Sequence, residues 1–298
     1  MARKFFQDLE AKLPRNTKHK VVVPLAANKA VALALKEALD KNLINGAILV
    51  GSPNAIKSEF GSLCESDKIS FVEAASEKEA LIKSVEEVKK GNADIIMKGM
   101  CQSASLIKAV LDKQNGLEHG FMSHLTCFQL PDKESFGLLT DSAVNIAPDE
   151  ETMLKIIENA YKVFKKLSNK TPMAALLAAN EKVSDKMPST KLAEAVSKRF
   201  AERSDIIVEG PVAFDLAVSS KSAQIKKYKG KMNGNADLFI APRIETANAL
   251  YKSLQHYIHA DMGGLLYGAS VPVIHPSRAD NAETKYNSLV LGIAAYYL

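Results

Sequence analysis

The amino-acid sequence predicts an α/β fold with two lobes, each built on a mostly parallel sheet that helices cover on both faces. Short, continuously apolar segments alternate with longer segments of helical periodicity, which is typical of parallel strands buried on both sides. The alternation is interrupted once, over residues 123–140, and then restarts. A chain of 298 residues is long enough for two ordinary domains with sizeable cores.

Four strand–helix units are expected in the first half of the chain, after a short amphipathic helix within residues 1–18. The expected strands are apolar and cover residues 20–25, 46–51, 69–74 and 93–97. The expected helices cover residues 28–42, 76–90 and 103–113, and a further helix opens at Ser52-Pro53. Ser76 is the expected N-cap of its helix, and Glu79 three residues later completes a capping box.

The middle of the chain changes character. Residues 123–129 and 136–140 alternate weakly around Pro131-Asp132, which predicts a pair of antiparallel strands. An amphipathic helix is expected at residues 149–167, after which the α/β pattern restarts. Its expected strands are residues 173–179, 206–210, 236–241 and 271–274, and its expected helices are 189–203, 219–227, 245–259 and 282–297. We expect residues 1–135 with 272–298 to form the first lobe and residues 136–271 to form the second.

Composition and charge narrow the classes of function. The net charge of +5 is spread along the chain, which favours anionic small molecules over a nucleic-acid partner. Cys64, Cys101 and Cys127 show no CxxC spacing, and their odd count beside a charged N-terminus predicts reduced thiols in a cytoplasmic protein. No apolar run approaches the length of a membrane span, and the histidines lack the spacing of metal ligands. We therefore expect neither a membrane anchor nor a metal.

Basic side chains follow two of the expected strands at their carboxyl ends, where open α/β sheets bind ligands. Lys98 comes directly after one strand, and Gly99 would let a ligand approach the backbone closely. A surface lysine that merely caps the sheet is the alternative. Ser277 and Arg278 follow the last strand, and the planar arginine fork matches a phosphate edge. Glycine-rich phosphate loops are absent from the sequence, so side chains and helix N-termini would have to hold any phosphate.

Two further pairs of residues are candidates on helices. Asn248 and Lys252 lie four residues apart and share one face of the helix expected at 245–259. Ser189 and Thr190 follow Pro188, where they can cap the next helix and also bind an anion at its N-terminus.

Ser123 and His124 open the strand expected at 123–129. His124 could serve as a general base, although a lone histidine is more often a hydrogen-bonded structural residue. No G-x-S-x-G elbow surrounds any serine, which argues against a serine hydrolase.

Eight segments occur in an order that matches a known family. They are residues 93–99 (ADIIMKG), 122–124 (MSH), 139–149 (LTDSAVNIAPD), 186–190 (KMPST), 208–215 (VEGPVAFD), 235–242 (NADLFIAP), 248–252 (NALYK) and 277–285 (SRADNAETK). In these segments the chain resembles the phosphate acetyltransferase/phosphate butyryltransferase family, and its butyryl branch most closely. The resemblance extends over nearly the whole chain from about residue 20.

The resemblance implies an acyltransferase that moves a short acyl group reversibly between coenzyme A and inorganic phosphate. It implies a two-lobed fold like that of isocitrate and isopropylmalate dehydrogenases, an active-site cleft between the lobes, and a homodimer or larger homo-oligomer. Acyl-CoA, phosphate and acyl phosphate would be the partners. Coenzyme A would be a substrate, and no bound cofactor, nucleic acid or membrane would be involved.

The resemblance also assigns roles to residues. Arg278 would hold phosphate, and Ser277 would lie beside the CoA sulfur and the reacting carbonyl. The acetyl branch carries an aspartate, proposed as the base, at the position of Thr284. Glu283 is therefore the candidate base here, although it points about 100° away on a helix. The expected substrate-binding residues are Lys98, Ser123, His124, Asn145, Ser189, Thr190, Asn248 and Lys252.

Three departures from the family pattern keep alternatives open. Arg243 stands where an acid is common, Ala247 where a glycine is common, and Leu216 where an asparagine is common. One alternative is acetyl specificity, since a methylene contributes only about 1–3 kcal/mol of discrimination. A second is an oxidoreductase on the related dehydrogenase fold, and a third is a non-catalytic paralogue that binds acyl-CoA or acyl phosphate.

Overall fold

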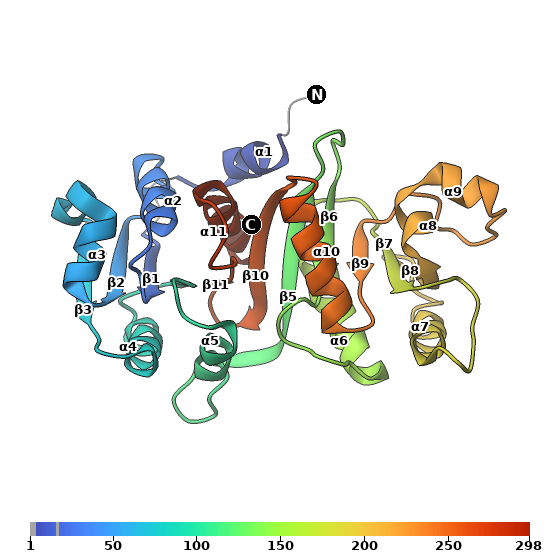
Figure 1. Cartoon of the computed structure of the whole chain (residues 1–298), viewed down its shortest axis with the longest axis horizontal. Coiled ribbons are helices and arrows are strands. Elements are labelled where there is room, and N and C mark those ends of the chain that lie inside the picture. The colour runs from blue at the N-terminus through green and yellow to red at the C-terminus, as the bar shows by residue number, and fades with distance from the viewer. Residues whose placement is uncertain (1–3, 16–17) are drawn as a thin grey trace. The chain divides into compact units, whose positions relative to one another are not determined.

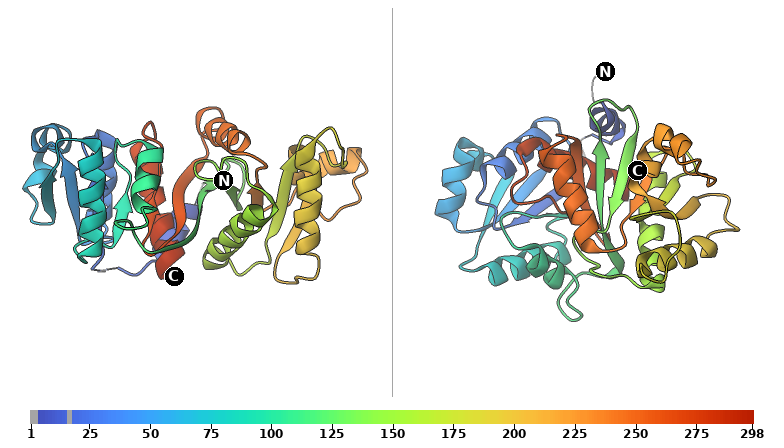
Figure 2. Two further views of the ribbon diagram at one scale, coloured as in Figure 1. Left: turned by 90° about the horizontal axis from the view of Figure 1, so that it is seen from below. Right: turned by 45° about the vertical axis from the view of Figure 1, so that its right-hand side comes forward.

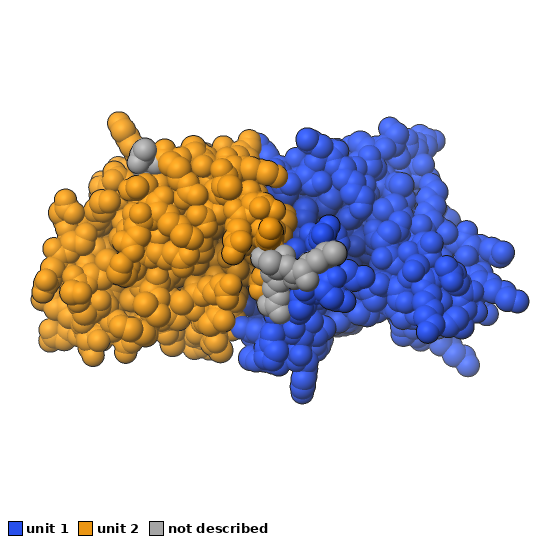
Figure 3. Space-filling view, turned by 90° about the horizontal axis from the view of Figure 1, so that it is seen from above, with its two compact units in different colours: residues 1–3, 123–260 blue, residues 4–122, 261–298 orange. Residues whose placement is uncertain are grey.

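The computed structural model of the chain describes residues 4–15 and 18–298. The described residues form two compact units, coloured orange and blue in Figure 3. Unit 2 holds Lys4–Met122 and Asp261–Leu298, and unit 1 holds Ser123–Ala260. The lobes expected from the sequence exchanged at residues 135/136 and 271/272, later than the units do. The second boundary was expected too late because residues 261–269 form a strand that the sequence pattern does not reveal.

Unit 2 contains the predicted strand–helix units. Its strands are β1 (Lys20–Pro24), β2 (Gly46–Gly51), β3 (Ile69–Glu73), β4 (Ile95–Met97), β10 (Asp261–Ala269) and β11 (Val273–Ile274). They follow the order β3-β2-β1-β4-β11-β10, and β10 alone runs antiparallel to its neighbour β11. Every residue of β2 is buried, as a strand covered on both faces requires.

The helices of unit 2 divide between the two faces of its sheet. They are α1 (Phe5–Lys12), α2 (Lys29–Asp40), α3 (Pro53–Phe60), the 3₁₀ helix η1 (Gly61–Glu65), α4 (Glu77–Lys89), α5 (Ser103–Val110) and α11 (Ala282–Tyr297). Helix α2 packs against α3 and α11, whereas α4 packs against α5 (Figure 1). Right-handed crossovers produce this division, because the chain moves outward from β1 to β3 and then returns across β1 to β4. Ligands in open α/β sheets bind outside the carboxyl ends of strands at such a reversal.

Unit 1 begins at Ser123, within β5 (His119–Gln129), which forms the predicted antiparallel pair with β6 (Phe136–Thr140). Strands β7 (Met173–Ala178), β8 (Ile207–Ala213) and β9 (Leu238–Ile240) continue the sheet in the order β5-β6-β9-β7-β8, parallel to β6. Its helices are α6 (Glu150–Leu167), α7 (Pro188–Arg199), α8 (Phe214–Val218), α9 (Ser220–Ile225) and α10 (Ile244–His256). Helix α6 packs against α7, and α8 packs against α9 (Figure 2).

Strand β10 is the strand that the sequence analysis missed, while α8 and η1 are helices that it missed. Its sequence, DMGGLLYGA, contains three glycines, which are rare in strands. A Cβ on Gly263 would lie 2.9 Å from the carbonyl oxygen of Asn287 on α11, so the glycine permits close helix–sheet packing. Gly268 has a φ of +119°, a conformation that favours glycine. The glycines are needed for helix–sheet packing and for backbone conformation, and neither need can be recognised from the local sequence pattern.

Local capping follows the sequence closely in unit 2. The Ser76 hydroxyl accepts a hydrogen bond from the Glu79 amide at 3.2 Å, which confirms the predicted N-cap of α4. The Glu79 carboxylate accepts from the amide of Ala75, one residue before the cap, at 2.8 Å.

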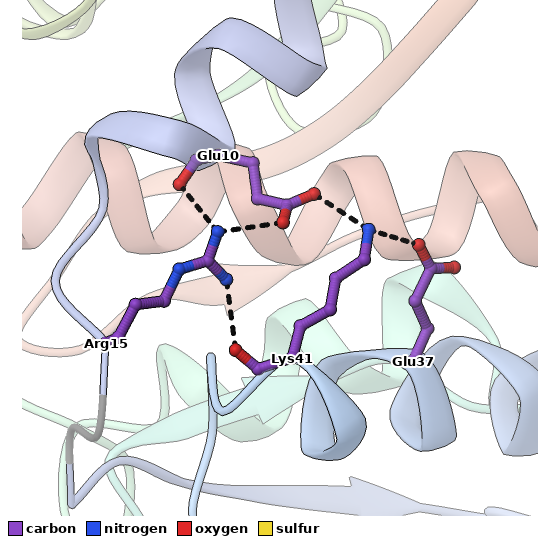
Figure 4. Close-up of polar contacts among 4 residues, drawn as sticks. All are labelled: Glu10, Arg15, Glu37 and Lys41. Carbon is purple, nitrogen blue, oxygen red and sulfur yellow. Dashed lines mark hydrogen bonds and ion pairs between the residues drawn. The ribbon is translucent and has the colours of Figure 1, made fainter.

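Helix α1 is attached to the end of α2 by a cluster of charged side chains (Figure 4). The Glu10 carboxylate accepts hydrogen bonds from Arg15 at 2.9 Å and from Lys41 at 3.0 Å. Lys41 also donates to Glu37 at 2.7 Å. Burial raises the pKa of Glu10, but the hydrogen bonds from Arg15 and Lys41 outweigh it and leave the pKa below its usual value. Each charge in this cluster has its partners within the fold.

Candidate active site

Lys98 stands at the reversal point of the unit 2 sheet, directly after β4. Its amide donates to the carbonyl of Ile274 on the neighbouring strand β11 at 2.9 Å. A Cβ on Gly99 would lie 2.4 Å from the carbonyl oxygen of Pro24 and 2.5 Å from that of Leu25. The glycine is therefore required because the backbone after β4 lies against the backbone at the end of β1. The sequence analysis instead attributed this glycine to the close approach of a ligand.

Lys98 is a buried residue whose ammonium has no close partner among the described residues. The residue is 2% exposed, and no hydrogen bond or ion pair of its ammonium occurs within the described part of the chain. Burial lowers the pKa of Lys98, and the charge of Arg278 lowers it further, while Cys101, Asp280 and Glu77 act in the opposite direction. A desolvated cation without a partner destabilises a fold. An anionic ligand would supply the missing partner.

The segment after β11 forms a tight turn from Ser277 to Asp280. The Ser277 amide donates to the Asp280 carboxylate at 2.7 Å, and the Asp280 amide donates to the Ser277 carbonyl at 3.1 Å. Arg278 lies exposed at the tip of this turn. The Asn281 side chain then caps α11 by accepting from the Thr284 amide at 2.8 Å. Since β4 and β11 are parallel neighbours, the structure brings Lys98 and the Ser277–Arg278 turn to the same edge of the sheet.

Lys285 is the residue that the sequence analysis missed in this region. Its ammonium donates to the carbonyls of Ser277 at 2.9 Å, Asp280 at 2.9 Å and Arg278 at 3.4 Å. Burial lowers the pKa of Lys285 to about 8; Asp280 opposes this shift and Lys98 adds to it. The available signal was its place at the end of the segment 277–285 (SRADNAETK), in the first turn of a helix that is mostly apolar further on. We refer to Lys98, Ser277, Arg278, Asp280 and Lys285 as the basic cluster.

Glu283 lies in the first turn of α11 and is exposed. No hydrogen bond or ion pair of its carboxylate occurs among residues 4–15 and 18–298. Thr284 stands at the position of the family aspartate. Its amide donates to the Asn281 side chain, and its carbonyl accepts from the Ser288 hydroxyl at 2.6 Å.

A second group of polar side chains surrounds the carboxyl end of β6 in unit 1. The buried Asp141 carboxylate accepts from the amides of Ala143 and Val144, both at 2.9 Å. It also accepts from the Asn145 side chain at 2.7 Å. Asn145, an expected substrate-binding residue, thus closes this loop through Asp141.

His124 joins the same group from β5. Its Nδ1 lies 2.8 Å from the Ser142 hydroxyl, and its carbonyl accepts from the Thr140 hydroxyl at 2.8 Å. The exposed Asn248 on α10 donates to the Ser142 carbonyl at 3.3 Å. The structure therefore brings together three expected residues, His124, Asn145 and Asn248. We refer to His124, Thr140, Asp141, Ser142 and Asn145 as the loop cluster.

Three other expected residues have structural contacts within unit 1. Ser123 is completely buried, and its hydroxyl accepts from the Asn159 side chain at 3.0 Å. The buried Thr190 hydroxyl donates to the Met187 carbonyl at 2.7 Å. The Lys252 ammonium lies 4.8 Å from the ring centroid of Tyr251.

The predicted capping of α7 by Ser189 and Thr190 was wrong. Met187 is the N-cap, and no side-chain hydrogen bond caps the helix. The Thr190 hydroxyl instead accepts from the Ser184 amide at 3.0 Å, because the chain before α7 folds back into a closed loop. Ser189 is half-buried in the first turn of the helix.

The departures from the family pattern fall at two kinds of position. Ala247 and Leu216 are buried in the core, whereas Arg243 is an exposed N-cap whose guanidinium lies 3.7 Å from the Glu245 carboxylate. Among the described residues, no three His, Cys, Asp or Glu side chains gather in a way that could hold a metal ion. No described helix has the length and apolarity to cross a membrane.

Comparison with known proteins identifies relatives over nearly the whole chain. The sequence profile of the family described as "Phosphate acetyl/butaryl transferase" matches residues 73–293. The phosphate butyryltransferase of Clostridium acetobutylicum is 36% identical over 293 residues, which cover 97% of this chain and 97% of that protein.

Solved structures give the same result. The branched-chain phosphotransacylase from Enterococcus faecalis V583 superimposes with a TM-score of 0.82 at 32% identity, covering 94% of this chain and 99% of that one. The 4-hydroxythreonine-4-phosphate dehydrogenase from Klebsiella pneumoniae shares the fold alone, with a TM-score of 0.53 at 9% identity over 93% of this chain and 100% of that one. The predicted α/β, dehydrogenase-like fold is confirmed. The predicted family is confirmed as well, and the chain belongs to the phosphate acetyl/butyryl transferase family.

Proposed function

We propose that the chain catalyses reversible transfer of a short acyl group between coenzyme A and inorganic phosphate, so that acyl-CoA and phosphate give acyl phosphate and CoA. Membership of the family supports the reaction class. The observation that carries the proposal is the buried residue Lys98, whose ammonium has no close partner in the described part of the chain and lies at the strand edge that also presents Arg278. In the basic cluster, three cationic side chains face the single carboxylate of Asp280, an imbalance that favours a dianion such as phosphate.

In this mechanism, a phosphate oxygen attacks the thioester carbonyl, the new C–O bond forms and the C–S bond breaks. The proton of hydrogen phosphate ends on the CoA sulfur, which balances the reaction. The thioester is already activated, so catalysis rests on positioning and charge stabilisation. Arg278 and Lys98 hold the phosphate, and Ser277 lies beside the reacting carbonyl.

Direct attack by phosphate is favoured over an acyl-cysteine intermediate. Cys101 is the thiol nearest in sequence to Lys98, and it is completely buried. Burial raises the pKa of Cys101 to about 11, although Lys98 opposes the shift. A thiol with this pKa is protonated at neutral pH and is a poor nucleophile.

Glu283 remains our candidate for the group that exchanges the proton with the CoA thiol. Replacement of Glu283 by Gln should shift the pH dependence of kcat, because a general base contributes its own ionisation to that profile. The measurement is the rate between pH 5.5 and 9 for both proteins. An unchanged profile would place the base elsewhere.

The remaining expected residues complete the proposal. His124, Asn145 and Asn248 in the loop cluster and its neighbourhood, together with Ser123, Ser189, Thr190 and Lys252, are proposed to contact the acyl-CoA. A homodimeric or larger assembly and a cytoplasmic location are likewise proposals.

The acyl chain distinguishes the main proposal from its alternative. Relatives are a phosphate butyryltransferase and a branched-chain phosphotransacylase, which support a pocket larger than acetyl. Acetyl-CoA is the alternative substrate, since the family description includes acetyl transfer.

The test is the release of free CoA thiol from acetyl-, butyryl- and isobutyryl-CoA, with and without phosphate. Rapid release that requires phosphate would establish acyl transfer, and the ranking of the three substrates would define the acyl pocket. Binding of CoA without any release would support the non-catalytic paralogue instead. Reduction of NADP by 2-hydroxy acids would support a dehydrogenase.

A further inference from the structure

We propose that Lys285 is a positioning residue that holds the Ser277–Asp280 turn in the conformation that presents Arg278 to phosphate. The inference rests on the proposed function and assigns a role to Lys285, which ends the segment 277–285 but was given no role from the sequence. Lys285 acts through the backbone of the turn.

The contacts of Lys285 account for every proton of its ammonium. The group has three donors, and they reach the carbonyls of Ser277, Arg278 and Asp280 at 2.9, 3.4 and 2.9 Å. One side chain thus holds three of the four carbonyls of the turn to the first helical turn of α11. The Asp280 carboxylate holds the Ser277 amide from the other side, at 2.7 Å. The backbone on both sides of Arg278 is fixed, while the Arg278 side chain itself is exposed.

The chemistry of this arrangement differs from that of an ordinary core contact. Lys285 is 1% exposed, and its own hydrogen bonds to the turn run to uncharged carbonyls. A methionine would fill a similar volume at a smaller desolvation cost. The ammonium offsets the partial negative charge of three carbonyl oxygens close to Arg278 and Lys98. A turn without that charge would leave three carbonyl oxygens without their hydrogen bonds.

Titration should switch this contact near the working pH of many enzymes. Asp280 and Lys98 are the charged groups that act on Lys285, while Arg278, Cys101 and Glu77 act on Lys98 in turn. Burial lowers the pKa of Lys285 to about 8, so the charged form with its three donors predominates only below that pH. The neutral amine has two donors and leaves one carbonyl of the turn without its bond. Affinity for phosphate should therefore fall as the pH rises through 8.

The experiment compares the wild type with Lys285→Met and Lys285→Arg, with Lys108→Met as the control. Lys108 is an exposed lysine on α5 of the same unit, and its replacement removes an equal charge. Steady-state rates are measured over a range of phosphate concentrations at saturating butyryl-CoA. They are also measured over a range of butyryl-CoA concentrations at saturating phosphate. Both series are repeated at several pH values from 6.5 to 9. Melting temperatures with and without inorganic phosphate report binding independently of turnover.

The expected result for Lys285→Met is a KM for phosphate raised about tenfold or more, with the KM for butyryl-CoA within about twofold of wild type. The rise of the wild-type phosphate KM above pH 8 should disappear in this variant. Lys285→Arg should recover part of the affinity and should lose the pH dependence, since arginine stays charged. The control should match the wild type.

An unchanged phosphate KM in Lys285→Met, or equal changes in both KM values, would overturn the positioning role. If Lys285→Met does not fold, a normal phosphate KM and a normal pH profile in Lys285→Arg would overturn it equally. A wild type that releases no thiol with phosphate would refute the proposed function instead. In that case, a phosphate-induced rise in melting temperature that Lys285→Met lacks would still support the contact.

Discussion

The basic cluster of unit 2 and the loop cluster of unit 1 occupy similar places, since each follows the carboxyl end of sheet strands, but they treat buried charge differently. In the loop cluster, the Asp141 carboxylate is surrounded by amide donors of the following residues. In the basic cluster, Lys98 is a buried residue, and its ammonium has no close partner among the described residues. The first arrangement stabilises a loop, whereas the second leaves a charge that an anion can complete.

Groups that stabilise the fold differ from groups that are available to bind a ligand. A group whose hydrogen bonds are all made within the fold contributes to the folded state, and its loss exposes buried partners. A buried cation without a partner lowers stability until a ligand binds. A variant of Asp141 should therefore change mainly stability, whereas a variant of Lys98 should change mainly activity.

Arg278 should give the largest effect on activity. Arg278→Ala should lower kcat/KM by about 10²–10³-fold, because it removes a charge-assisted, two-pronged contact with phosphate. The melting temperature should stay within error of the wild type, since the exposed guanidinium makes no hydrogen bond or ion pair in the described part of the chain. Near-normal turnover would remove Arg278 from the mechanism. A large loss of stability would contradict the view that Arg278 binds phosphate without stabilising the fold.

Lys98 should give the clearest separation of the two quantities. Lys98→Met should lower kcat/KM for phosphate about 10–100-fold, and it should raise the free energy of unfolding by about 1 kcal/mol because a desolvated charge is removed. The measurements are phosphate-dependent thiol release and urea unfolding, with the exposed Lys108→Met as the control. A destabilised but fully active variant would show that Lys98 is structural.

Asp141 should show the reverse behaviour. Asp141→Ala should lower the free energy of unfolding by about 2–3 kcal/mol, because the amides of Ala143 and Val144 lose their acceptor in a buried site. Asp141→Asn keeps one carbonyl acceptor and should cost less. Urea unfolding of both variants checks the prediction. Equal stability of all three proteins would mean that solvent or another group replaces the carboxylate.

Glu10 provides the smallest effect and a test of paired charge away from both clusters. Glu10→Gln should lower the free energy of unfolding by about 0.5–1 kcal/mol at pH 7 and leave activity unchanged, because its partners Arg15 and Lys41 are partly exposed. The pKa of Glu10 lies lower in the folded chain than in the unfolded chain. Its stabilisation is therefore complete above the unfolded value and disappears as the pH falls through the folded one. A stability difference between the two proteins that does not shrink as the pH is lowered would contradict this assignment.

The sequence by itself determined the fold class, most of the helices and strands, and the family. Hydrophobic periodicity is a local property, so it located buried segments such as β2 and the capping box of α4 without knowledge of their neighbours. Lys98 and Arg278 were recognisable for the same reason, since each follows an apolar strand that ends at a turn.

The tertiary structure alone decided which polar groups find partners. Strand β10 could not be predicted because its glycines are required by the packing of α11 and by backbone conformation. Neither requirement produces a pattern of apolar residues in the sequence. Ser123 is satisfied by Asn159, 36 residues away, and the Lys285 ammonium depends on a turn that the chain closes before α11 begins. Burial and hydrogen-bond geometry are set by neighbours in space. For that reason the sequence could propose charged residues at strand ends. Only the folded chain separates Lys285, the lysine that restrains the turn, from Lys98, which has no partner among residues 4–15 and 18–298.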